Sequence, residues 1–95
     1  MKKNILINAA NLHVGGGVQV AVSFIYEMTK FDKHNFSNIN IIVSTEVNQG
    51  LSQLNANISI FKSYRVIDFF GIKTFFSSLN KEIKKYDLIF SIFGP

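Results

Sequence analysis

With 95 residues, the chain is long enough for one small domain. Hydrophobic residues make up 47% of it, including ten phenylalanines, and this composition excludes an intrinsically disordered chain. The net charge is +4, but the basic residues are scattered along the sequence, which argues against a nucleic-acid-binding protein.

The sequence pattern argues against a signal peptide and against a membrane span. Lys2 and Lys3 precede the apolar run Ile5–Ile7, but Asn8 ends it, whereas the apolar core of a signal peptide needs roughly 7–15 residues. No run approaches the about 18 apolar residues of a membrane span. The chain also contains no cysteine, which fits a reducing compartment. We therefore expect a cytoplasmic protein.

The first predicted elements are a strand at Ile5–Ala10 and a helix from about Gly16 to Phe31, joined by a glycine-rich loop. A polar turn, Asp32–Asn35, ends the helix. The helix places one apolar stripe on a single face, with Phe24 at its edge. The residues of that stripe are Val18, Ala21, Val22, Ile25 and Met28.

In the middle of the chain, the pattern of apolar residues predicts two further strands. Ile39–Thr45 is nearly continuous in apolar residues, as in a strand that is covered on both faces. Asn48–Asn55 is interpreted as a short helical turn anchored by Leu51 and Leu54. Asn57–Phe61 alternates between apolar and polar residues, which is typical of a half-buried edge strand. The following residues, Lys62–Ile67, are predicted to form a loop.

The last predicted elements are a helix over Asp68–Tyr86, with Asp68 as its N-cap, and a buried strand over Asp87–Phe93. Strands and helices thus alternate, which favours an α/β fold: a Rossmann-like, three-layer α/β/α arrangement around a parallel sheet. If the third strand is the edge, the strand order is 3-2-1-4. The switch point then brings Asn8–Gly17 beside Ser91–Pro95.

The glycines Gly15, Gly16 and Gly17 form the leading candidate site. Glycine lets a ligand approach the backbone closely, and the free N–H groups of a helix N-terminus suit a phosphate or another anion. The alternative is that the three glycines form only a tight connection between strand and helix. Common nucleotide fingerprints do not match, because Val20 stands where G-x-G-x-x-G needs its third glycine and no Gly-Lys-Ser/Thr follows.

Other polar residues near this loop leave several interpretations open. His13 is either an acid or base facing the cleft or an ordinary loop histidine. Asn8 and Asn11 either orient a ligand or cap the loop. Glu46 lies 29 residues after Gly17, further than the about 20 expected for a ribose contact. The two histidines and the isolated acidic residues show no metal-ligand spacing, so no metal site is predicted.

The segment Ile5–Ile25, with its strand, glycine loop and helix, resembles the opening of retaining glycosyltransferases of the GT-B fold. In particular, it resembles family 4 (group 1) enzymes of bacterial polysaccharide synthesis, whose fourth strand looks like Tyr86–Pro95. Residues 1–95 would then be the truncated front part of the acceptor-side, N-terminal Rossmann-like domain, without the C-terminal donor domain.

The resemblance implies transfer of a sugar from a nucleotide-sugar donor to a glycan or lipid-linked acceptor, without a separate cofactor. Gly15, Gly16 and Gly17 would approach the donor diphosphate. The acceptor side of the cleft would be lined by Asn11, His13, Phe93 and Gly94, while the catalytic residues stay unknown.

A lipid-linked acceptor implies peripheral contact with the inner face of the membrane, for which Phe69, Phe70 and Lys73 are candidates unless the phenylalanines are core. Two other classes compete with the glycosyltransferase. The main alternative is a Rossmann-type nucleotide-binding oxidoreductase or epimerase domain. A receiver-like regulatory module comes last, since it needs acidic residues where the chain has Asn8 and Asn11.

Overall fold

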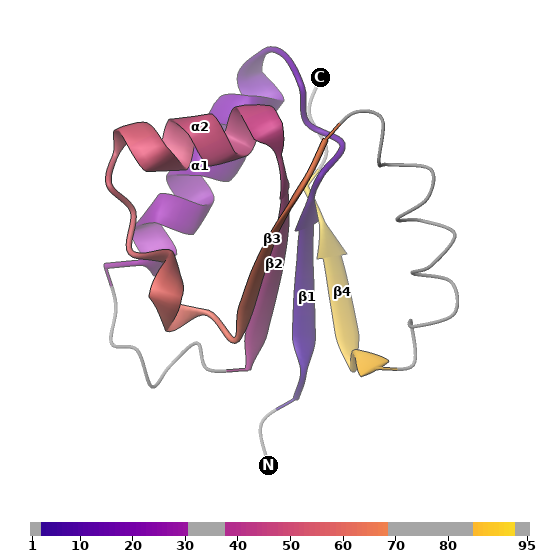
Figure 1. Cartoon of the computed structure of the whole chain (residues 1–95). Coiled ribbons are helices and arrows are strands. Elements are labelled where there is room, and N and C mark those ends of the chain that lie inside the picture. Colours follow the sequence, from indigo (N-terminus) through magenta and orange to yellow (C-terminus); the bar gives the residue numbers. More distant parts are fainter. Residues whose placement is uncertain (1–2, 31–37, 69–84, 93–95) are drawn as a thin grey trace.

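A computed structural model describes residues 3–30, 38–68 and 85–92, and Figure 1 shows a sheet with the described helices on one side of it. The strands are parallel and their order is β3-β2-β1-β4, which confirms the predicted α/β fold and the 3-2-1-4 order. In chain order the elements are β1 (Ile5–Ala9), α1 (Gly16–Met28), β2 (Ile39–Ser44), α2 (Thr45–Gln53), the short 3₁₀ helix η2 (Ile58–Ile60), β3 (Ser63–Ile67) and β4 (Leu88–Ser91).

The central strand β1 fixes the register of the sheet. Asn8 lies opposite Ile42 of β2 on one side and Ser91 of β4 on the other. The N–H of Ile92 donates to the carbonyl oxygen of Asn8 at 2.9 Å, so the segment after β4 stays beside the end of β1. The predicted switch point between the first and fourth strands is therefore confirmed as far as Ile92.

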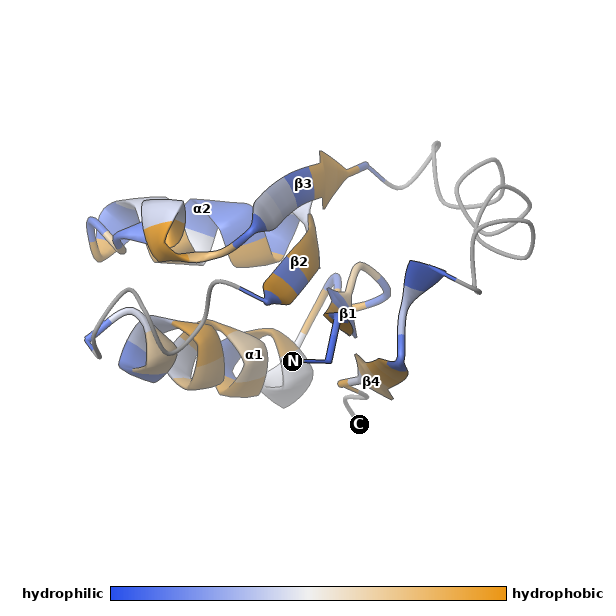
Figure 2. Cartoon of the chain, turned by 90° about the horizontal axis from the view of Figure 1, so that it is seen from below, coloured by the Kyte–Doolittle hydropathy of each residue, from blue (hydrophilic) through white to orange (hydrophobic). Residues whose placement is uncertain are grey.

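Helices α1 and α2 cover the same face of the sheet, and Figure 2 shows both on one side of the strands. The predicted stripe of α1 is confirmed: Ala21 and Ile25 are fully buried, and Phe24 at the edge of the stripe is exposed. The core on this face consists of Ile7, Ala9, Leu12, Ala21, Ile25, Ile39, Ile41, Val43, Val47, Leu51, Ile60 and Phe61.

The opposite face of the sheet buries a smaller cluster made of Leu6, Ala10, Ile42 and Ile67. Tyr86 and Ile89 pack against it. The helix predicted over Asp68–Tyr86 falls almost entirely on residues 69–84, outside the described ranges, so the third layer stays a prediction. Tyr86 itself is not helical. The predicted polar turn Asp32–Asn35 also lies outside the described residues.

The prediction for the third strand is wrong. Ile58–Ile60 forms a 3₁₀ turn, and the strand is Ser63–Ile67, the segment predicted to be a loop. In the turn Ile60 is buried, so the alternation of apolar residues reflects one anchor in a tight turn rather than a pleated strand. Backbone pairing of Ser63–Ile67 with β2 outweighs the polar side chains of that segment.

The second helix also differs from its prediction. It begins at Thr45 rather than Asn48, because the Ser44 side chain caps it and ends β2 one residue earlier than predicted. The anchors of α2 are Val47 and Leu51, which are buried, whereas the predicted anchor Leu54 is 44% exposed.

Strand β4 is less buried than predicted. Leu88 is 42% exposed and Phe90 is 56% exposed, because neither of the described helices packs over this strand. On the α1 side of the sheet, an apolar groove of ≈ 400 Å³ separates β4 from the helix, and Val20, Phe24 and Phe90 line it. By contrast, all six residues of β2 are buried, as predicted.

The described helices are too short or too polar to form a bilayer crossing.

Candidate functional site

The carboxyl ends of β1, β2 and β4 lie at one edge of the sheet, and both helices begin there (Figure 1). Two neighbouring helix N-termini at this edge differ in how their first N–H groups are satisfied. This difference decides which of them can receive an anion.

The N-terminus of α1 is formed by the glycines that the sequence singles out. Gly15 is the N-cap residue and adopts φ 78° and ψ −159°, a region of backbone space open almost only to glycine. Because glycine has no side chain, it cannot cap the first-turn N–H groups, and the turn that follows reads Gly-Gly-Val-Gln. Gly15 and Gly16 are exposed, whereas Gly17 is buried. The positive end of this helix dipole therefore faces solvent at Gly15 and Gly16.

The N-terminus of α2 is already satisfied by the protein itself. The hydroxyl oxygen of Ser44, a fully buried residue, accepts a hydrogen bond from the N–H of Val47 at 3.1 Å. The carboxylate of Glu46 lies in the first turn of this helix, where it offsets the positive end of the dipole. Of the two N-termini, only that of α1 therefore presents uncapped N–H groups without an acidic neighbour in its first turn.

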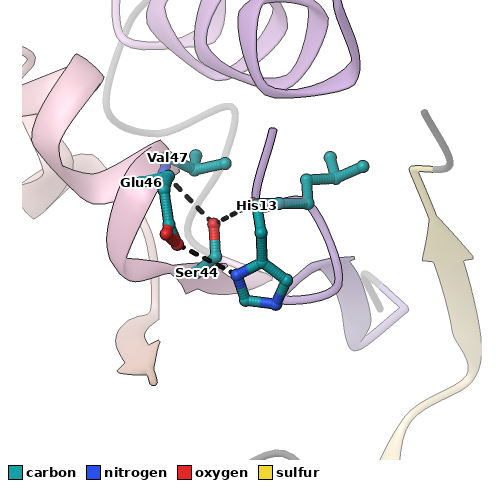
Figure 3. A network of polar contacts seen from close by, with 5 residues as sticks. His13, Ser44, Glu46 and Val47 are labelled. Atoms are coloured by element: carbon teal, nitrogen blue, oxygen red, sulfur yellow. Dashed lines mark hydrogen bonds and ion pairs between the residues drawn. The ribbon is translucent and has the colours of Figure 1, made fainter. Parts of the chain in front are cut away.

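Two contacts tie the loop before α1 to the start of α2, as Figure 3 shows. The hydroxyl of Ser44 donates to the carbonyl oxygen of Leu12, and the imidazole Nδ1 of His13 lies 2.9 Å from Oε1 of Glu46. Because a carboxylate accepts only, Nδ1 is assigned as the nitrogen that carries the proton. The loop is thus held at two successive residues.

The contact with His13 also changes the acidity of its partner. The hydrogen bond from His13 is the main cause that lowers the pKa of the Glu46 carboxyl, against a smaller opposing effect of burial. The side chains are partly accessible, 23% for His13 and 37% for Glu46. Glu46 is therefore ionised at neutral pH and keeps the imidazole in a fixed orientation beside the glycine loop.

The two asparagines of the loop have different environments. Asn8 is 6% exposed, and its Oδ1 accepts a hydrogen bond from the N–H of Ala10 at 3.0 Å. This hydrogen bond supports the interpretation of Asn8 as a loop-capping residue. Asn11 is exposed at the same edge. Of the predicted cleft residues, Asn11 and His13 thus lie at the sheet edge next to the glycines.

Some predicted residues fall outside the described ranges: Phe93, Gly94, Phe69, Phe70 and Lys73. Within residues 3–30, 38–68 and 85–92, no three His, Asp or Glu side chains are grouped so that they could hold a metal ion.

Sequence reasoning missed the pairing of His13 with Glu46 and the cap at Ser44. Glu46 drew attention only as a ribose contact, judged by its distance along the chain from Gly17. The available signal was the serine at the end of a buried apolar run, because serine is a strong N-cap residue. With the helix start placed at Ser44, Glu46 would have been assigned to the same sheet edge as His13.

Comparisons of the chain with protein families, with curated proteins and with solved structures give no match.

Proposed function

We propose that this chain is the front part of the acceptor-side, N-terminal Rossmann-like domain of a GT-B glycosyltransferase. The whole protein would transfer a sugar from a nucleotide-sugar to a glycan or lipid-linked acceptor in the synthesis of bacterial surface polysaccharide. The single observation that carries the proposal is the uncapped N-terminus of α1 at Gly15 and Gly16, beside the switch point of the sheet. The sequence resemblance of Ile5–Ile25 and Tyr86–Pro95 to such enzymes adds the substrate class.

The chemistry of the reaction suits this site. When a glycosyl group leaves a nucleotide-sugar, negative charge develops on the departing diphosphate. Backbone N–H groups fixed at a helix N-terminus stabilise such charge without having to reorganise during the reaction. The tether of Leu12 and His13 to α2 keeps the loop in place, which supports this role for the N–H groups.

A titration of the ¹⁵N-labelled chain followed by NMR tests the proposal. We expect UDP and inorganic pyrophosphate to shift the backbone amide signals of Gly15–Val18, and uridine to leave them unchanged. The amides of Thr45–Val47 are the internal control, because Ser44 and Glu46 already satisfy that N-terminus. Equal shifts at both N-termini would contradict the proposal. A larger response to NAD than to UDP would favour an oxidoreductase or epimerase domain instead.

A matched pair of variants locates the bound anion. Gly16 is exposed and lies in the helix, so Gly16→Val folds but places a branched side chain where the phosphate oxygens would lie. We expect UDP binding to weaken about tenfold or more, the typical cost of losing a well-placed contact to a charged group. Ser23→Val, at an exposed position further along α1, should bind like wild type. If both variants bind UDP equally well, the glycine loop is only a connection.

A further inference from the structure

A second pocket lies away from the glycine loop, between α2, η2 and the beginning of β3. Its volume is ≈ 440 Å³, within the roughly 300–1,000 Å³ typical of small-molecule sites. Tyr64 belongs to the first half of β3 and Ile58 to η2, so the pocket lies near the amino ends of the strands. It is therefore separate from the candidate site at their carboxyl ends.

Polar side chains reach this pocket from one face of the second helix. Asn48 and Ser52 are four residues apart, and Asn55 follows three residues later, so the three fall on one side of α2 and its extension. Leu51 lies between them and provides an apolar floor. The wall thus alternates hydrogen-bonding groups with aliphatic surface.

Tyr64 forms the facing wall and holds one of these polar groups in a fixed orientation. Its hydroxyl donates to Oδ1 of Asn48 at 2.8 Å. Burial raises the pKa of Tyr64 to about 12, so the phenol stays neutral and keeps donating at any ordinary pH. Because Oδ1 of Asn48 is turned towards the tyrosine, the amide nitrogen of Asn48 is presented as a donor.

Asn55 adds a second amide through its backbone conformation. It has φ 53°, the left-handed conformation that commonly ends a helix and that usually belongs to glycine. Asparagine tolerates this conformation and, unlike glycine, brings a side chain that both donates and accepts hydrogen bonds. Asn55 is one of the residues that line the pocket.

We propose that this pocket binds a neutral, polyhydroxylated ligand, namely a single sugar residue of a saccharide. Among the described residues that line it, none carries a charge, which disfavours phosphate, carboxylate and ammonium ligands. Amide and hydroxyl groups match the paired donors and acceptors of sugar hydroxyls. The aliphatic surface of Ala56 and Ile58 suits the C–H face of a sugar ring. This inference does not rest on the proposed donor site.

The test is an NMR titration of the ¹⁵N-labelled chain with glucose, galactose and N-acetylglucosamine. Concentrations up to about 50 mM detect the millimolar Kd that one sugar residue would have. We expect at least one sugar to shift the side-chain amide signals of Asn48 and Asn55, while the signals of Gly15–Gly17 stay in place. Failure of all three sugars to shift the Asn48 and Asn55 signals overturns the proposal.

Variants and a chemical control sharpen this test. Asn55→Gly keeps the left-handed backbone without strain and removes only the amide, so sugar binding should weaken about threefold to tenfold, as for the loss of one hydrogen bond. Tyr64→Phe keeps the ring but releases Asn48, and it should weaken binding similarly. Gln49→Ala removes an exposed amide of the same helix outside the pocket and should bind like wild type.

Two further results would overturn the saccharide assignment. One is equal sugar affinity in Asn55→Gly and Gln49→Ala. The other is a response to N-methylacetamide as large as the response to the sugars, which would indicate recognition of a peptide group instead. Both are independent of whether UDP shifts the glycine loop, so failure here and failure of the proposed donor site can be told apart.

Discussion

Gly15 determines how the chain passes from β1 into α1. Its φ of 78° with ψ near −159° is a conformation that a side chain makes strained, although the space around its α-carbon is open. We therefore expect Gly15→Ala to lower the free energy of unfolding by about 1–3 kcal/mol through backbone strain alone. Gly16 is helical and exposed, so Gly16→Ala should change stability by less than about 1 kcal/mol or raise it.

Urea unfolding of the two alanine variants, monitored by circular dichroism, measures this difference. Each variant adds one methyl group, at one of two neighbouring positions. The comparison therefore controls for the size and hydrophobicity of the added group. If both variants lose equal amounts of stability, the positive φ at position 15 imposes no backbone strain on an alanine there.

The hydrogen bond between His13 and Glu46, which holds the same loop, contributes to folding stability in a pH-dependent way. The pKa of Glu46 is lowered in the folded state, so its stabilising contribution is complete well above 4.5, the ordinary value, and is lost as the pH falls through the lowered pKa. The contribution is no more than about 1 kcal/mol, because 37% of the carboxylate side chain is exposed to screening by solvent.

We therefore expect Glu46→Gln to lose less stability than wild type when the pH falls from neutral to about 3, the range in which carboxylates become protonated. Urea unfolding at the two pH values is the measurement. Glu27→Gln controls for the removal of an acidic side chain as such, since Glu27 pairs with Lys30 at the exposed surface of α1. If Glu46→Gln and wild type lose equal amounts of stability, the contact with His13 contributes nothing to the folded state.

At the scale of the elements, Ser44 joins two parts of the fold. Its hydroxyl oxygen caps α2 by accepting a hydrogen bond from the N–H of Val47. The same hydroxyl donates to the carbonyl oxygen of Leu12 in the loop between β1 and α1. Ser44→Ala removes both bonds and leaves polar backbone groups unsatisfied, so we expect a loss of about 2–3 kcal/mol in the free energy of unfolding. Ser23→Ala, on the exposed side of α1, should be close to neutral. A Ser44→Ala variant as stable as Ser23→Ala would show that neither bond matters.

The elements also show what sequence patterns can predict. The stripe of α1 and the buried run of β2 were predictable, because a helix stripe and a wholly apolar strand each have one dominant interpretation. The third strand was missed although Tyr64, Val66 and Ile67 are strand-forming residues, because the polar residues between them hid the pattern. The pairing of this segment with β2, which lies well before it in the chain, identifies it as a strand.

The candidate site was predictable to a similar degree. The glycines and the edge of the sheet follow from local sequence, since a strand, a glycine run and a helix stripe determine where the loop lies. The partnership of His13 with Glu46 does not, because it joins residues 33 positions apart. It requires both the correct start of α2 and the pairing of β1 with β2, and the first of these was placed at Asn48 rather than Thr45.

At the scale of the whole molecule, the strand order explains why burial is uneven across the sheet. Helices α1 and α2 lie on one face, over the part of the sheet formed by β1, β2 and β3, as expected for right-handed crossovers between these strands. Strand β4 lies beyond α1, and the groove lined by Val20, Phe24 and Phe90 follows from that geometry. The apolar surface of the groove therefore has a topological cause, separate from the chemistry of the glycine loop.

The whole-molecule prediction concerns catalysis by the proposed glycosyltransferase. Sugar transfer requires the donor and the acceptor hydroxyl to be held in register, with reacting atoms about 3–3.5 Å apart, and in a two-domain cleft groups from both sides supply that alignment. Residues 1–95 would contribute one wall only. We therefore expect the purified 95-residue chain to bind UDP through the amides of Gly15–Val18 but to release no UDP from UDP-glucose or UDP-N-acetylglucosamine. The measurement is a coupled assay for released UDP with and without a saccharide acceptor, using an unrelated active glycosyltransferase as the positive control. Steady turnover of either nucleotide-sugar by this chain alone would show that one domain suffices, and the two-domain proposal would then be wrong.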